Sequence, residues 1–193
     1  MTKPVFEALR FFAIGCMVVL LAGHAQAAAN PYRRMVEHYA PPDVVLVNQN
    51  GEKVHFVDLV QSGKPVIVDF IYSACAGVCP ALSAGYANLQ KKLGPESNNV
   101  HLVSISIDPE NDTPKVMREF LKRYQAKPGW DFLTGSRDDI DKLMYAFNAY
   151  IPNKTYNFPL TLIHSPADGS WIRLFGLLSN DDFYNECKRV GVK

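Results

Sequence analysis

The chain has 193 residues and carries nearly equal numbers of basic and acidic side chains, 20 Lys and Arg against 19 Asp and Glu. Its content of 48% hydrophobic and 20% charged residues is that of an ordinary globular domain. These values exclude an intrinsically disordered chain, a collagen-like chain and a strongly basic nucleic-acid-binding protein. Four cysteines are too few for a disulfide-dense scaffold.

The first 27 residues have the layout of a secretory signal peptide. Lys3 and Arg10 form a positive segment, residues 11–23 are apolar, and residues 25–27 (Ala-Gln-Ala) are a small-x-small cleavage pattern. The apolar stretch is short for a membrane span, which needs ~20 residues. An uncleaved anchor is the alternative. We therefore expect an exported protein, periplasmic or anchored to the outer face of the inner membrane, where thiols can oxidise.

The domain itself is expected to start with a hairpin. Residues 28–40 are interpreted as a short lead-in and residues 41–193 as one domain. Residues 44–47 and 54–56 predict two short strands around an Asn-Gly turn. One helical turn is expected to follow at residues 59–63, where it ends at a glycine.

The rest of the chain alternates strands with helices. Strands are predicted at 66–71, 100–107, around 133, 159–164 and 171–176, and helices at 81–93, 113–125, 137–148 and 179–188. The run at 66–71 is almost continuously apolar, which is typical of a strand buried on both faces. This order predicts an α/β fold with a central mixed β-sheet flanked by helices and an N-terminal β-hairpin.

Cys75 and Cys79 lie between the predicted buried strand and the following helix. Reaction sites gather at the carboxyl ends of such strands, and a helix N-terminus lowers the pKa of a nearby thiol. On a helix, the i, i+4 spacing would place both sulfurs on one face. Such a pair can form a reversible disulfide or hold a soft ion such as Cu(I). An inert disulfide or two buried thiols are the alternatives. Cys187 is left over, and we expect it to be a buried thiol without a partner.

Three segments carry a resemblance to a known family. Residues 69–80 (DFIYSACAGVCP) resemble the CxxxCP signature of the SCO/SenC proteins, and residues 103–114 (VSISIDPENDTP) and 130–135 (WDFLTG) are similar to their second and third signatures. The resemblance covers about residues 40–190. It implies a thioredoxin-like fold and an exported, often membrane-tethered protein that acts in assembly of the copper centre of cytochrome c oxidase.

The resemblance also implies ligands and a partner. In this family the two motif cysteines and one distant histidine bind a copper ion, and members also act as thiol–disulfide reductases. Cys75 and Cys79 match the motif directly. The implied partner is a cysteine-containing copper protein such as a cytochrome c oxidase subunit. No nucleic acid is expected, and a membrane is expected only if the N-terminal segment is uncleaved.

The histidine of the family pattern is displaced in this chain. Counting back from Leu162-Ile163 places it near residues 156–158, where the sequence is Tyr-Asn-Phe. His164 is the nearest candidate. It lies six to eight residues away, or roughly 20–26 Å along a strand. His164 is therefore either a third copper ligand brought in by a rearranged loop or a surface residue at a hairpin mouth. Pro159 resembles the cis-proline of thioredoxin-like oxidoreductases, with an ordinary trans bond as the alternative.

Three functions remain open from the sequence. The first is a copper-binding assembly factor that uses Cys75, Cys79 and His164. The second is a thiol–disulfide oxidoreductase without copper, in which Cys75 attacks and Cys79 resolves, with a proton supplied by water or by Asp108. The third is a binding domain with an inert disulfide. Asp108 is otherwise expected to form the turn before the next helix.

Overall fold

Eight strands form one mixed sheet in the computed structural model, which describes residues 32–192. Their order across the sheet is β1-β8-β7-β4-β5-β6-β2-β3. Strands β4, β5 and β6 are parallel, and every other pairing is antiparallel. In chain order the strands are β1 (Arg33–Glu37), β2 (Val45–Asn48), β3 (Lys53–His55), β4 (Val66–Ile71), β5 (His101–Ser106), β6 (Trp130–Thr134), β7 (Leu160–His164) and β8 (Trp171–Phe175).

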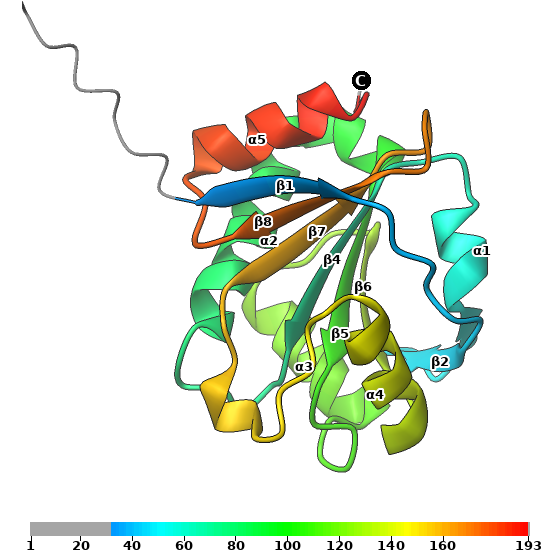
Figure 1. The fold of residues 1–193 in the computed structure, drawn as a ribbon. Helices are drawn as coiled ribbons and strands as arrows, with labels where there is room; N and C mark the ends of the chain where they lie inside the picture. The colour runs from blue at the N-terminus through cyan, green and yellow to red at the C-terminus, as the bar shows by residue number, and fades with distance from the viewer. Residues whose placement is uncertain (1–31, 193) are drawn as a thin grey trace, which may run out of the picture.

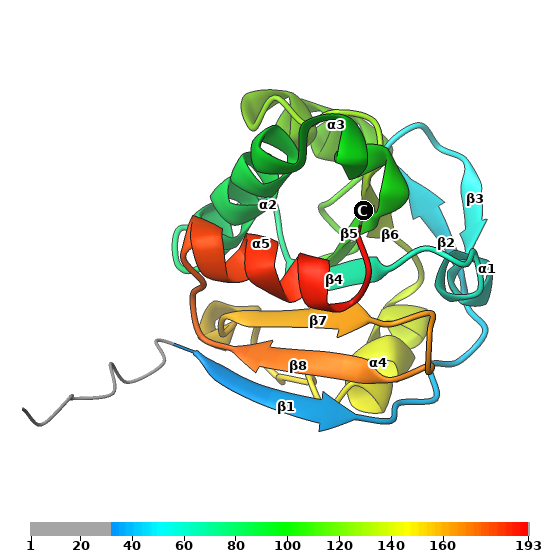
Figure 2. The ribbon, with the colours of Figure 1, turned by 90° about the horizontal axis from the view of Figure 1, so that it is seen from above.

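Helices cover both faces of this sheet (Figures 1 and 2). Helices α2, α3 and α5 lie on one face, and α4 lies on the other (Figure 2). The helices are α1 (Phe56–Val60), α2 (Cys79–Leu93), α3 (Pro114–Arg123), α4 (Arg137–Ala146) and α5 (Asn180–Arg189), with 3-10 turns η1 (Gly94–Asn99) and η2 (Lys154–Tyr156). Thr113, Ser136 and Ser179 each accept a backbone N–H bond at the start of α3, α4 and α5, which explains where these helices begin.

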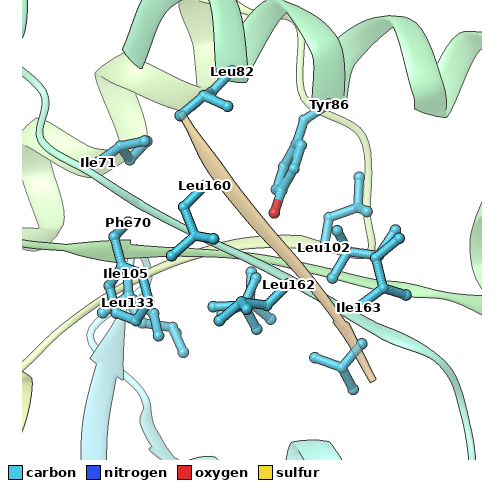
Figure 3. Packing of buried hydrophobic residues seen from close by; sticks show 14 of the residues in the cluster. Phe70, Ile71, Leu82, Tyr86, Leu102, Ile105, Leu133, Leu160, Leu162 and Ile163 are labelled. Atoms are coloured by element: carbon cyan, nitrogen blue, oxygen red, sulfur yellow. The ribbon is translucent and has the colours of Figure 1, made fainter. Parts of the chain in front are cut away.

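The core lies on both sides of β4, whose six residues are all buried. Leu82 and Tyr86 point from α2 toward the sheet, where Leu102 and Leu162 lie (Figure 3). On the opposite face, the ring of Phe147 packs against those of other aromatic residues, namely Tyr39, Phe56, Phe70 and Trp171. A strand buried on both faces needs apolar side chains at consecutive positions, which accounts for the continuous run at 66–71.

The structure confirms the α/β class, the mixed sheet and the N-terminal hairpin, and it differs at two places. Strand β1 lies within residues 28–40, which were expected to be a lead-in, and it pairs with β8 at one edge of the sheet. The first helix starts at Phe56 rather than near residue 59. Phe56 is completely buried, and its N–H donates to the Val44 carbonyl, so the chain turns into the helix directly after β3. The predicted signal peptide at residues 1–27 lies outside the described residues.

Candidate functional site

The two motif cysteines both follow the carboxyl end of β4, but one lies in a loop and the other in a helix. Cys79 is the first residue of α2, followed by Pro80 in the first turn. Cys75 lies four residues earlier in the loop, where its N–H donates to the Tyr72 carbonyl at 3.2 Å. Proline has no N–H to donate the hydrogen bond of a helix interior, but it fits the first turn, where that N–H has no partner. Only Cys79 lies on the helix, so the pair shares a loop–helix junction rather than the single helix face that an i, i+4 spacing within a helix would give.

Cys75 is half-buried, and its sulfur is surrounded by donors. Partial burial favours the neutral thiol, but hydrogen bonds from the Cys79 side chain, from the N–H groups of Cys79 and Gly77, and from Tyr72 outweigh it and lower the pKa of Cys75. Donors that point at a sulfur stabilise its thiolate. Cys75 is therefore the more readily ionised thiol of the pair, and it is the one that solvent reaches.

Cys79 has the opposite environment. Its side chain is buried, with 1% of the residue exposed. Burial, together with the hydrogen bond to Cys75, raises the pKa of Cys79 to about 12. Two factors oppose this rise, a backbone hydrogen bond associated with Tyr72 and a hydrogen bond from the Asn157 amide. The two neighbouring thiols therefore differ in both exposure and acidity.

Asn157 is the site residue that the sequence analysis missed. It lies between η2 and β7, and its Nδ2 donates to the Cys79 Sγ at 3.4 Å and to the Phe70 carbonyl at 2.8 Å. Position 157 is within the segment in which the family pattern predicts a histidine. Its signal in the sequence is that Asn157 places a polar side chain in that segment, just before the apolar strand β7.

Asp112 connects the cysteine loop to the neighbouring strand. Its carboxylate accepts hydrogen bonds from the Ser73 N–H and hydroxyl and from the Ser106 hydroxyl, the last at 2.6 Å. Ser106 is the last residue of β5, and Ser73 begins the loop that carries Cys75. This buried carboxylate thus fixes the loop to the sheet two residues before the first cysteine.

Asp108 lies near the site and forms the turn before α3. Its carbonyl accepts from the N–H groups of Asn111 and Asp112, and its carboxylate accepts from Asn111 and from Lys154, the latter at 2.5 Å. The Lys154 ammonium also lies 5.4 Å from the centre of the Tyr72 ring. Asp108 is therefore connected to the Tyr72 ring through Lys154, and no direct bond from it to either sulfur is found among the described residues.

His164 is not brought to the cysteines. It is the last residue of β7, paired in register with Val66 at the start of β4 and with Trp171 on β8. The cysteines follow the other end of β4, about 17 Å away at 3.3 Å per residue. The histidine is buried rather than exposed, its ring lies 4.9 Å from that of Trp171, and burial lowers its pKa.

The remaining expectations concern Pro159 and Cys187. No cis peptide bond occurs among residues 32–192, so the bond before Pro159 is trans. Cys187 on α5 is completely buried and forms no disulfide with another described residue, as expected. Burial raises its pKa to about 12. It is therefore an unreactive thiol of the core.

As possible metal ligands, the two cysteine sulfurs of the site fit a soft ion better than a hard one. Two sulfurs and the Asn157 amide surround the junction. Within residues 32–192, no three residues of the types His, Cys, Asp and Glu lie close enough together to hold a metal ion. Two thiolates suit Cu(I), whereas Cu(II) prefers imidazole and further ligands.

None of the described helices has both the length and the apolar character needed to cross a membrane.

Comparison with known proteins gives one consistent result. Residues 37–167 match the SCO1/SenC family model. The chain is 38% identical over 107 residues to "SCO1 protein homolog" of Bacillus subtilis, covering 54% of each chain. It is 34% identical over 141 residues to "Protein SenC" of Rhodobacter capsulatus, covering 72% of this chain and 61% of the relative. The matched regions thus span only 54–61% of these two curated relatives.

Solved structures agree with the sequence comparisons. BsSco, described as a Sco-family cytochrome c oxidase assembly protein with a disulfide switch, has a TM-score of 0.67 at 29% identity, covering 79% of this chain and 94% of BsSco. Bradyrhizobium japonicum ScoI with copper bound has a TM-score of 0.64 at 26% identity, covering 80% and 99% of the two chains. These similarities confirm that this chain has the thioredoxin-like fold of the Sco proteins.

Proposed function

This chain belongs to the SCO1/SenC family, and we propose that it assists assembly of the copper centre of cytochrome c oxidase by thiol–disulfide exchange at Cys75 and Cys79. The observation that carries the proposal is the inequality of the two thiols. Cys75 is half-buried with a lowered pKa, and Cys79 is buried with a pKa raised to about 12. Thiol–disulfide exchange in two steps requires an accessible attacking thiolate and a neighbouring thiol that resolves the mixed disulfide.

The reaction begins with the dithiol form of the protein. The Cys75 thiolate attacks one sulfur of a partner disulfide, a Cys75–partner S–S bond forms, and the other partner sulfur leaves as a thiolate. Cys79 then loses its proton to solvent and attacks the Cys75 sulfur. The Cys75–Cys79 bond forms, the second partner thiolate leaves, and the partner has gained the two electrons that the protein has lost.

The substrate that we propose is a cysteine-containing copper protein, such as a cytochrome c oxidase subunit. Its copper ligands must be reduced thiols before they can bind metal, because the thiolate is the ligand. The layout of residues 1–27 supports an exported protein that meets this partner outside the cytoplasm, in the periplasm or at the membrane surface. The nearly equal numbers of acidic and basic residues favour recognition by shape over attraction of a charged partner.

A second candidate function is delivery of Cu(I) as cargo. The closeness of the two sulfurs favours it, since two thiolates suffice to hold Cu(I). The copper-bound ScoI structure supports the same function by analogy. His164 is not included in this proposed site, because the sheet register places it at the far end of β4 and β7.

Two measurements test these proposals on the purified chain. The reduction potential of the Cys75–Cys79 pair, measured against glutathione, should lie above roughly −300 mV if the disulfide is a working one. A lower value, typical of a structural disulfide, would contradict the exchange proposal. An anaerobic Cu(I) titration against a competing chelator tests the second function. Cys75→Ser and Cys79→Ser should each abolish tight binding, and Cys187→Ser is the matched control.

A further inference from the structure

The buried thiol Cys79 is a poor nucleophile unless something stabilises its charge. Its side chain is buried, with 1% of the residue exposed, so water can do little to solvate a negative charge on its sulfur. A thiolate is the form that attacks. The resolving step therefore depends on whichever donors still point at the Cys79 sulfur.

One side-chain donor is positioned for this. The Asn157 amide nitrogen has two N–H groups. One is bound by the Phe70 carbonyl at 2.8 Å, at the end of the buried strand β4, and the other is directed at the Cys79 Sγ at 3.4 Å. The bond to the backbone fixes the amide, so its second N–H faces the sulfur without a large entropy cost.

The segment that carries Asn157 is itself held in place. Asn153 Oδ1 accepts from the Thr155 N–H at the start of η2, and the Asn157 N–H donates to the Lys154 carbonyl. Phe158, which follows, packs its ring against Phe175 at 5.6 Å. These contacts hold position 157 over the start of α2 in this structure.

From this arrangement we infer that Asn157 is a catalytic residue of the resolving step, which donates a hydrogen bond to the Cys79 thiolate as it attacks the mixed disulfide. The inference rests on the proposed function, since it assigns a role within that exchange. It also separates the two steps. The first attack uses Cys75, whose donors are Tyr72, Gly77 and Cys79, so the loss of Asn157 should leave that step nearly unchanged.

The test uses the full chain with Cys16→Ser, which removes the fourth cysteine, in the apolar stretch of residues 11–23. The reduced protein is mixed with one equivalent of dithiobis(nitrobenzoate). Attack by Cys75 releases one coloured thiolate, and resolution by Cys79 releases a second, so the two steps appear as two phases. In Asn157→Leu we expect the first phase to keep its rate and the second to slow about tenfold, the effect of one hydrogen bond to a charged group. Mass spectrometry should show the mixed disulfide accumulating between the phases.

Two further variants make the result specific. Asn157→Asp has the same shape but offers no N–H to the sulfur, so it should slow the second phase at least as much. Asn111→Leu is the matched control, because the Asn111 amide donates to Asp108 and not to a sulfur. It should leave the second phase as fast as in the parent chain.

The possible outcomes separate the two levels of the proposal. Two normal phases in Asn157→Leu and Asn157→Asp would overturn the role of Asn157 and leave the exchange function standing. Equal slowing of both phases would assign Asn157 a structural role and would also overturn it. If the parent chain releases a single coloured thiolate, there is no resolving step, and the proposed function fails together with the inference.

Discussion

Asp112 and Ser73 join two strand ends that lie side by side at the site. The Asp112 carboxylate, completely buried, receives both the N–H and the hydroxyl of Ser73 and also the hydroxyl of Ser106 at the end of β5. Hydrogen bonds to a charged acceptor are stronger than those between neutral groups. If the acceptor is removed, each donor that remains buried without a partner lowers the stability of the fold. The cysteine loop is therefore fixed at the point where it leaves β4.

Asp112→Ala should destabilise the protein. It leaves the Ser73 and Ser106 donors without their acceptor, which is expected to cost about 3 kcal/mol of the free energy of unfolding. Urea denaturation measures this directly. Glu110→Ala is the control from the same loop, because Glu110 forms an exposed ion pair with Arg137 that is worth less than about 1 kcal/mol. Equal losses in the two variants would contradict the anchoring role of Asp112.

Asp69 predicts a pH dependence of stability. It lies within β4 and is completely buried. Burial raises its pKa from 3.8 to about 7, against a smaller opposing effect of a hydrogen bond from the Ser104 side chain. As the pH rises from 3.8 to about 7, the unfolded chain releases this proton while the folded chain retains it. The free energy of unfolding therefore falls across that range by at most about 1.4 kcal/mol per pH unit and levels off above it.

Asp69→Asn removes the titrating group and should therefore abolish its contribution to the pH dependence of the free energy of unfolding. The stability of the variant relative to the parent should grow as the pH rises through this range, as measured by urea denaturation at several pH values. Asp58→Asn, at an exposed position in α1, is the matched control and should give a constant difference. A constant difference for Asp69→Asn as well would show that the Asp69 carboxyl has an ordinary pKa in the folded protein.

The strands and helices were largely predictable because their signals are local. The apolar run of β4 and the Thr, Ser and Pro residues at helix starts each specify an element within a few residues. Strand β1 was missed because an edge strand has little burial to shape its pattern, and two of its five residues, Val36 and Met35, are the apolar ones. Its pairing with β8 is a contact between distant segments, which local patterns do not encode.

The site was predictable in part for the same reason. Cys75 and Cys79 are close in sequence and follow a recognisable strand. Asn157 reaches Cys79 from 78 positions away, and no local pattern indicates that contact. His164 was a candidate ligand because it is the nearest histidine in the sequence. Along a strand, however, each residue adds about 3.3 Å, so a histidine at the other end of the strand lies far from the cysteines.

Asn157→His should convert the site to one that holds copper more tightly. It would place an imidazole beside Cys79, in the segment where the family pattern predicts the histidine ligand, and imidazole suits Cu(II). Because even an outer partner of a ligand changes metal affinity about 10–100-fold, a new direct ligand should raise Cu(II) affinity at least about tenfold. Competition titration with a chelator measures it, and Asn111→His is the control. Equal affinities in the parent and Asn157→His would show that position 157 does not face the metal.

His164→Ala should leave Cu(I) affinity unchanged. The imidazole lies at the opposite end of β7 from the cysteines and packs on Trp171, with its Nδ1 buried and unpartnered among the described residues. Its removal should instead cost about 1–2 kcal/mol of the free energy of unfolding through lost packing. An anaerobic Cu(I) titration and urea denaturation of the same variant separate the two effects. A large loss of Cu(I) affinity in a folded variant would mean that His164 reaches the cysteines, which requires the β4–β7 pairing to differ in the copper-bound protein.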